Sequence, residues 1–330
     1  MVSIKNPNPP LETQTQAPGL LAVKGGAIPS SVLFWNRNTS QVEAEKVYGE
    51  SGLKWAYRSR LGRFLTHWVL SRAWVSRLSG AYQSSRWSCR KIAPFIQRFE
   101  IPMDDFESGP FQSFNDFFIR KFKPGIRSFA QDPKQLAAFA EGRYFAFEKV
   151  APTQKFPVKG SFLSAEALLG DSPTAQSLAQ KFEGGPLVLA RLCPTDYHRF
   201  HFPDSGRVVG AYPVPGRFHS VNPIAIQARN EIFATNERRV TLLETVHFGL
   251  LAMIEVGAMG VGKIVETHPH DLSFQRGDEK GYFLFGGSTV IVLGQPNRWK
   301  PSQDLLNNTQ EGREVLVRLG DPVGDLQGFI

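Results

Sequence analysis

The sequence has little of what marks secreted, metal-binding or membrane-spanning proteins. Its 330 residues include only two cysteines, Cys89 and Cys193, which lie far apart and form no CxxC pair. This excludes a disulfide framework and a cysteine-based metal site, and it favours a reducing compartment. No run of about 18 uncharged apolar residues occurs, so no membrane-spanning helix is predicted, and any membrane contact should be at the surface.

Acidic residues are absent from residues 51–99. The same stretch holds ten lysines and arginines, more than the whole net charge of +8, so the positive excess is concentrated there. Tryptophan interleaved with arginine is typical of surfaces that contact anionic lipid, although a helical subdomain with packed tryptophans has the same composition. No basic cluster with a nucleic-acid-binding motif is present, so no nucleic-acid partner is expected. The tryptophans of this stretch are Trp55, Trp68, Trp74 and Trp87.

The first part of the chain divides into an arm and a helical region. Residues 1–40 are rich in Pro, Asn and Gln and indicate a loosely ordered arm. Apolar residues between Leu61 and Trp68 recur at helical spacing and predict an amphipathic helix. Ser113, with an acidic residue three positions later, predicts a capped short helix. Residues 41–125 are therefore predicted to form a basic amphipathic helical region.

Beyond residue 125 the pattern changes to short apolar runs bounded by turn residues, which predicts many strands. Helical interruptions are expected at Ser164–Leu169 and Ala175–Phe182. The predicted fold class is α+β, with the N-terminal helical, membrane-associating region packed on a β-rich, barrel-like or sandwich-like domain over residues 126–330. The predicted strands are Tyr144–Phe147, Leu187–Leu192, Val208–Val214, Arg239–Thr245, Leu250–Val256, Gly262–Glu266, Val290–Leu293 and Glu314–Leu319.

A Gly-Gly bend before Ser288 is the first candidate site. An aromatic run precedes Gly286-Gly287 and a β-branched run follows Ser288, so a strand should enter and leave a bend that presents one hydroxyl. The second glycine of a nucleophile elbow is missing and the following run is strand-like, which leaves a serine hydrolase only a weak alternative. Phosphate-loop, HExxH and GxGxxG motifs are also absent.

Two of the seven histidines, His198 and His201, lie in an aromatic segment that ends at Pro203. On a helix they would share a face, whereas on a strand they would point to opposite sides. Pro203 favours a loop or strand edge, so the two imidazoles should perform different tasks. A third ligand at useful spacing is missing and no metal is predicted. Either histidine could instead be a hydrogen-bonded structural residue.

Six segments of the sequence can be compared with known families, namely Ser113–Pro124, Asp196–Pro203, Val214–Asn222, Asn236–Arg238, Val256–Gly262 and Gly277–Thr289. Taken together, these segments closely resemble phosphatidylserine decarboxylase. The resemblance runs from about residue 45 to the C-terminus, and its Gly-Gly form suggests a bacterial branch other than the common Leu-Gly-Ser-Thr one.

The resemblance implies a proenzyme that cuts itself between Gly287 and Ser288. The Ser288 hydroxyl would attack the Gly287 carbonyl, and elimination and hydrolysis would then leave a covalent pyruvoyl group derived from Ser288. By family analogy His201 is the base for this cleavage, and a carboxylate orients it. The products would be a large chain, 1–287, and a small chain, 288–330.

The implied reaction is the decarboxylation of phosphatidylserine to phosphatidylethanolamine and CO₂. The pyruvoyl group would form an imine with the substrate amine and accept the carbanion electrons. His198 matches the family histidine that returns a proton to the α-carbon. No free cofactor is required, and residues 126–330 would be the catalytic domain.

The carboxylate departs from the family pattern, because Glu141 stands where the family typically has Asp. Its extra methylene shifts the charge of an orienting group. A non-cleaving paralogue that binds acidic phospholipid without catalysis is therefore the alternative. The enzyme is expected to be a peripheral protein on the cytoplasmic face of the bacterial cell membrane, held to anionic lipid by its basic segment. A homo-oligomer is left open.

Overall fold

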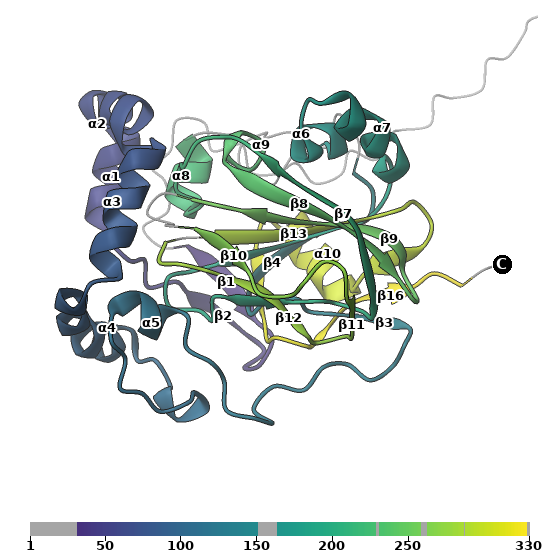
Figure 1. Ribbon diagram of the computed structural model, residues 1–330, viewed down its shortest axis with the longest axis horizontal. Helices are drawn as coiled ribbons and strands as arrows, with labels where there is room; N and C mark the ends of the chain where they lie inside the picture. Colours follow the sequence, from purple (N-terminus) through teal and green to yellow (C-terminus); the bar gives the residue numbers. More distant parts are fainter. Residues whose placement is uncertain (1–31, 151–163, 229–230, 259–262, 287, 329–330) are drawn as a thin grey trace, which may run out of the picture. The chain divides into compact units, whose positions relative to one another are not determined.

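One large ten-stranded sheet runs through the protein (Figure 1). The computed structural model describes residues 32–150, 164–228, 231–258, 263–286 and 288–328. Neighbouring strands are antiparallel except β1 and β15, which are parallel. In hydrogen-bonded order the strands are β11 (Ser273–Phe274), β7 (Gly206–Val214), β8 (Arg238–Thr245), β9 (Gly249–Val256), β13 (Ser288–Gly294), β5 (Leu187–Leu192), β4 (Gly142–Phe147), β15 (Glu314–Val317), β1 (Leu33–Asn36) and β2 (Gln41–Ala44).

Two three-stranded sheets complete the described β-structure. One consists of β10 (Ile264–Glu266), β12 (Glu279–Phe283) and β6 (Arg199–His201), and the other of β14 (Trp299–Pro301), β16 (Pro322–Leu326) and β3 (Gln135–Ala137). The large sheet has two edges, β11 and β2, and is therefore open. The predicted α+β class is confirmed. The predicted barrel-like form is wrong, because the described strands form no closed barrel.

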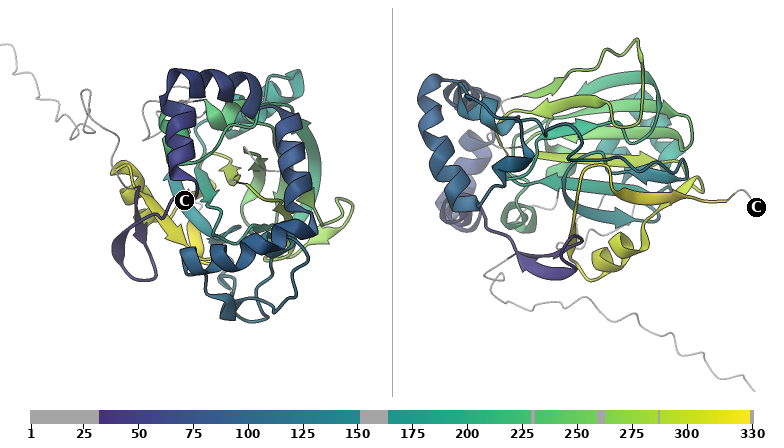
Figure 2. Two further views of the ribbon diagram at one scale, coloured as in Figure 1. Left: turned by 90° about the vertical axis from the view of Figure 1, so that its left-hand side faces the viewer. Right: turned by 90° about the horizontal axis from the view of Figure 1, so that it is seen from below.

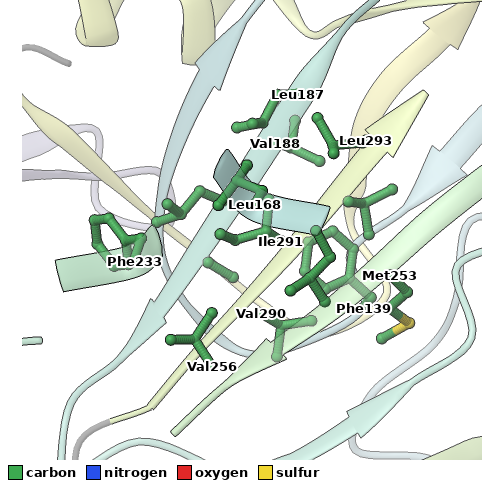
Figure 3. Packing of buried hydrophobic residues seen from close by; sticks show 14 of the residues in the cluster. Phe139, Leu168, Leu187, Val188, Phe233, Met253, Val256, Val290, Ile291 and Leu293 are labelled. Carbon is green, nitrogen blue, oxygen red and sulfur yellow. The ribbon is translucent and has the colours of Figure 1, made fainter. Parts of the chain in front are cut away.

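Strand β13 lies at the centre of the core. All its residues are buried, and it is paired along its length with β5 on one side and β9 on the other. Figure 3 shows Val290, Ile291 and Leu293 packed among side chains of the neighbouring strands. A strand covered on both faces has no polar side, which is why the sequence here is a continuous apolar run rather than an alternating one.

The N-terminal helices gather at one end of the strands, as Figure 1 and the left panel of Figure 2 show. Ser113 caps α5 by accepting a hydrogen bond from the Asp116 amide, which confirms the predicted N-cap. No helix in the described part of the chain is long and apolar enough to cross a membrane. The N-terminal helical elements are α1 (Glu50–Arg58), α2 (Arg60–Leu65), the π-helical turn η1 (Thr66–Leu70), α3 (Ala73–Gln83), η2 (Arg86–Lys91), α4 (Ile92–Phe99), η3 (Met103–Asp105) and α5 (Phe114–Phe118).

The later helices were predicted only in part. Both expected interruptions are confirmed, as α6 (Ala165–Leu169) and α7 (Pro173–Phe182). Three other helices were not anticipated, namely α8 (Pro223–Ala228), α9 (Ile232–Thr235) and α10 (Gln303–Gln310).

Strand β1 was also missed, since it lies within the segment expected to be a loosely ordered arm, yet it pairs with β15 and β2. All the described residues belong to one compact unit, and the domain boundaries at residues 40 and 125 stay predictions.

The predicted amphipathic helix presents its apolar residues to solvent. It is divided between α2 and η1. Leu61, Phe64 and Trp68 are each more than half exposed, at 61%, 60% and 54%. The helical spacing was read correctly, but these residues do not pack on the core.

A buried ion pair connects the large sheet to the sheet of β6, β10 and β12. Lys280 on β12 lies 3.0 Å from Glu255 on β9 and 2.8 Å from Glu266 on β10. Burial raises the pKa of Glu255 to about 7, although Lys280 acts in the opposite direction. The folded protein therefore holds a proton on Glu255 more tightly than the unfolded chain does.

This pKa predicts that stability falls as the pH rises. Between about 4.5 and about 7 the folded state binds more protons than the unfolded state, so raising the pH through this window favours unfolding. In the variant Glu255→Gln the side chain at position 255 cannot ionise. The Tm of this variant should therefore fall less than that of the wild type between about pH 5 and about pH 8. Thermal unfolding of both proteins checks this, with the exposed Glu244→Gln as control. Equal losses in all three would show that Glu255 is not responsible.

Candidate active site

Ser288 is the first residue of β13, and its side chain is buried. In the strand register it lies opposite Leu192, the last residue of β5. Gly286, two residues earlier, has φ +146°, a conformation that favours glycine and that explains why a bend can form before this strand. Gly287 lies outside the described residues, so the predicted cleavage site is described only on its serine side.

His198 contacts Ser288 directly. Its Nδ1 lies 3.2 Å from Ser288 Oγ, and its Nε2 lies 2.8 Å from the carbonyl oxygen of Cys193. A carbonyl oxygen can only accept, so Nε2 carries the ring proton and donates it to Cys193. Nδ1 is then left with a lone pair facing the serine hydroxyl. The arrangement can take a proton from Ser288 Oγ, or exchange one with a group built at that position.

The surroundings of His198 keep its imidazole neutral. Burial lowers its pKa to about 3, although the hydrogen bond to Cys193 acts in the opposite direction. The Phe118 ring stacks on the imidazole with centroids 3.8 Å apart and planes inclined by 23°. A neutral ring retains the lone pair that a base needs.

His201 makes a separate set of contacts at the end of β6. Its Nδ1 donates to the carbonyl oxygen of Gly277 at 2.9 Å, and its Nε2 accepts from the hydroxyl of Tyr197 at 3.3 Å. Burial lowers the pKa of His201 as well. The two histidines thus have different partners, as the strand reading suggested. No described hydrogen bond joins His201 to Ser288, and its role as cleavage base stays a prediction.

Glu141 is held by an arginine rather than by a histidine. Arg127 donates to both carboxylate oxygens, at 2.6 and 2.8 Å, and the Leu319 amide donates to one of them at 3.1 Å. Arg127 in turn stacks over the Phe122 ring at 4.2 Å. The described contacts do not bring Glu141 to His201, so its orienting role stays a prediction.

An apolar cavity of about 410 Å³ is lined by residues near Ser288, although Ser288 itself is not among them. It is lined by Phe285 and Gly286, just before the predicted cleavage site, and by Leu192 and Cys193 at the end of β5. Among its described lining residues only Arg191 is charged, and it is already paired with two carboxylates. The opposite wall comes from the N-terminal helical region, through Leu53, Trp55, Ala56 and Leu70.

Two contributors to the site had no signal in the sequence. The first is the Cys193 carbonyl, because a backbone group carries no residue-type pattern; the second is Arg127, one of many arginines until the fold places it beside Glu141. No group of three or more His, Cys, Asp or Glu side chains in the described chain could hold a metal ion, and none was predicted.

The lowered pKa predicts that His198 does not titrate near neutrality. Its imidazole should remain uncharged from about pH 8 down to about pH 5, because protonation would place a charge in an apolar environment. Titration of the ¹⁵N-labelled imidazoles by NMR, with His198→Gln used to assign the signal, checks this. An inflection between about pH 6 and pH 7 would contradict it.

Comparison of the sequence with known proteins identifies its family. Residues 114–325 match the phosphatidylserine decarboxylase family. The phosphatidylserine decarboxylase proenzyme of Clostridium kluyveri is 38% identical over 295 residues, covering 89% of this chain and 98% of the relative. The proenzymes of Desulfitobacterium hafniense (strain DSM 10664 / DCB-2) and Fusobacterium nucleatum are 37% and 36% identical over 89% of this chain and 98% and 97% of their own lengths. The chain belongs to the phosphatidylserine decarboxylase family.

Proposed function

We propose that Ser288 is the residue from which this carboxy-lyase makes its pyruvoyl group, by cleavage of the bond between Gly287 and Ser288. Phosphatidylserine decarboxylase proenzymes carry a pyruvoyl group formed by self-cleavage, and the reaction converts phosphatidylserine to phosphatidylethanolamine and CO₂. The observation that supports Ser288 most strongly is its buried hydroxyl, which faces the neutral imidazole of His198 at 3.2 Å. The residues present fit the group, since its precursor serine is buried and lies opposite Leu192, which lines the cavity.

Once formed, the pyruvoyl group supplies a ketone that accepts electrons from the substrate carbon as CO₂ leaves. The chain's own residues perform the remaining tasks. The burial of Ser288 keeps water away from residue 288, which limits unwanted proton transfer. His198 exchanges protons at residue 288, because Nδ1 points there while Cys193 holds Nε2.

The choice of base for self-cleavage lies between the two histidines. The resemblance assigns this step to His201, whereas the observed contact with Ser288 belongs to His198. His198→Gln separates them. If this variant is cut as fast as the wild type, His201 is the base and His198 acts only in decarboxylation. Either way, we expect the variant to lose decarboxylation by about 100-fold or more, the usual contribution of a general acid or base.

Self-cleavage predicts a simple change in mass. The wild-type protein should run as two pieces, and mass spectrometry should find a small chain of residues 288–330 that begins with a pyruvoyl group. Ser288→Ala has no β-hydroxyl to attack or eliminate, so it should remain one chain of 330 residues. The control Thr309→Ala removes a buried hydroxyl that donates no proton to the site, and this variant should still be cut. An intact wild-type protein would instead favour the non-cleaving paralogue that binds acidic phospholipid.

We further propose that the N-terminal helices rest on an anionic membrane, at the cytoplasmic face of the bacterial cell membrane. Their exposed surface carries large apolar side chains beside cations. Among the ten cations of residues 51–99, only Lys54 forms an ion pair within the described chain. Each lysine or arginine near an anionic surface contributes about 1 kcal/mol to binding. The exposed apolar residues are Trp55, Leu61, Phe64, Trp68, Trp74, Leu78, Tyr82 and Trp87.

The helices and the cavity support one route for the substrate. The cavity is lined by Trp55 and Leu70 from the helical region and by Gly286, two residues before Ser288. Phosphatidylserine could thus pass from a bilayer beneath the helices to residue 288 while its acyl chains stay among apolar side chains. The negative charge of phosphatidylserine also matches the basic segment, which would concentrate the substrate under the helices.

The exposed helix face predicts a measurable loss of membrane binding. Replacing Leu61, Phe64 and Trp68 together by Ser removes apolar surface that would enter the headgroup region, and binding to phosphatidylserine vesicles should weaken by about tenfold or more. Co-sedimentation measures this. The matched control replaces three exposed apolar residues elsewhere, Val209, Val246 and Leu272, by Ser. Equal weakening in both proteins would contradict a membrane role for the helices.

A further inference from the structure

A network of five buried charged side chains borders the candidate active site, since its member Arg191 also lines the cavity. Arg143 of β4 and Arg191 of β5 are opposite each other in the strand register, so two positive charges are adjacent inside the protein. Three carboxylates surround them, and the closest ion pairs are 2.5 to 3.1 Å long. Such networks often contribute little net stability, because each charge must be stripped of water. The carboxylates are Glu45, Asp196 and Glu314.

One member of this network reaches the catalytic histidine. The Asp196 carboxylate accepts from the Cys193 amide at 2.7 Å, and the Asp196 amide donates to the Cys193 carbonyl at 2.9 Å. Asp196 therefore holds the Cys193 residue at both its N–H and its C=O. The same carbonyl accepts from His198 Nε2, which leaves Nδ1 free for residue 288.

Asp196 is itself fixed from the other side. Arg143 donates to its carboxylate at 2.7 Å, and Arg120 donates to the carbonyl of Thr195 at 2.9 Å within the same turn. Burial raises the pKa of Asp196, and Arg143 acts against that rise. The turn from Cys193 to Asp196 is thus anchored at its side chain and along its backbone. A carbonyl anchored in this way can fix both the position and the tautomer of the imidazole that donates a hydrogen bond to it.

We propose that Asp196 is a positioning residue that holds His198, through the Cys193 carbonyl, in the Nε2-protonated form that faces residue 288. The inference rests on the proposed function, because it concerns the histidine that exchanges protons there. It assigns a purpose to a buried charge that contacts neither the cavity nor the serine.

Three variants test the proposal. Asp196→Ala removes both the acceptor for the Cys193 amide and the charge beside Arg143. Asp196→Asn keeps an oxygen for the amide and loses only the charge. The matched control, Glu314→Gln, removes a carboxylate from the same network. The described hydrogen bonds of the Glu314 side chain go to Arg191, and none goes to the Cys193 backbone or to His198. Thermal unfolding of all three shows how much stability each change costs.

The first readout is the formation of phosphatidylethanolamine from phosphatidylserine vesicles, expressed per cleaved molecule. Asp196→Ala should lower kcat by about tenfold or more and leave KM within about twofold, because a displaced imidazole affects proton transfer rather than binding. Asp196→Asn should lose about threefold, and Glu314→Gln should stay within about twofold of the wild type. If Asp196→Ala does not fold, the test depends on Asp196→Asn. A kcat of this variant equal to that of Glu314→Gln would then overturn the proposal.

The second readout is the tautomer of His198, measured by ¹⁵N NMR in full-length Ser288→Ala protein. With Asp196 present, His198 should be protonated on Nε2 alone, and with Asp196→Ala it should be a mixture of tautomers. An unchanged tautomer, an unchanged kcat, or equal losses in Asp196→Ala and Glu314→Gln would each overturn the proposal. A wild-type protein that makes no phosphatidylethanolamine would instead overturn the proposed function.

Discussion

A backbone carbonyl can accept a hydrogen bond but cannot donate one, and this constraint at Cys193 governs what can happen at Ser288. Because the carbonyl accepts from His198 Nε2, the other ring nitrogen must face the serine with a lone pair. Burial then keeps the ring neutral, so the lone pair is not lost to a solvent proton near neutral pH. The sheet, the Cys193–Asp196 turn and the stacked Phe118 ring all contribute to holding one imidazole in one state.

Much of the fold could be predicted from the sequence where the signal is local. The run Leu187–Leu192 is a strand with the predicted bounds, because a short, mostly apolar run with Gly or Pro residues on either side is a local strand signal. Ser113 caps its helix as expected, since a cap depends on a residue three positions away. Strand β1 was missed because it is a short stretch in a polar segment, and only its pairing with β15, far along the chain, makes it a strand.

The sequence singled out candidate residues for the site but not the contacts between them. Ser288, His198, His201 and Glu141 were all singled out, yet no local pattern could show which histidine meets the serine, since the pair is separated by 90 positions. Glu141 illustrates the same limit. Its carboxylate lies 2.6 Å from a basic side chain, as expected of an orienting group, but that side chain is Arg127 and not His201. Contacts between distant segments depend on how the sheets pack, and single-residue patterns carry no information about that.

The position of β13 and β15 inside the large sheet has a consequence for the life of the enzyme. Each lies between two strands that belong to residues 1–287, so after a cut before Ser288 the shorter polypeptide would remain as two interior strands of its partner's sheet. It could leave only if the sheet were opened. A molecule whose prosthetic group had been damaged could therefore not be repaired by exchanging that polypeptide, and the cell would have to degrade it and translate a new precursor. Each copy would thus acquire its catalytic group once, and its working lifetime would end with that group.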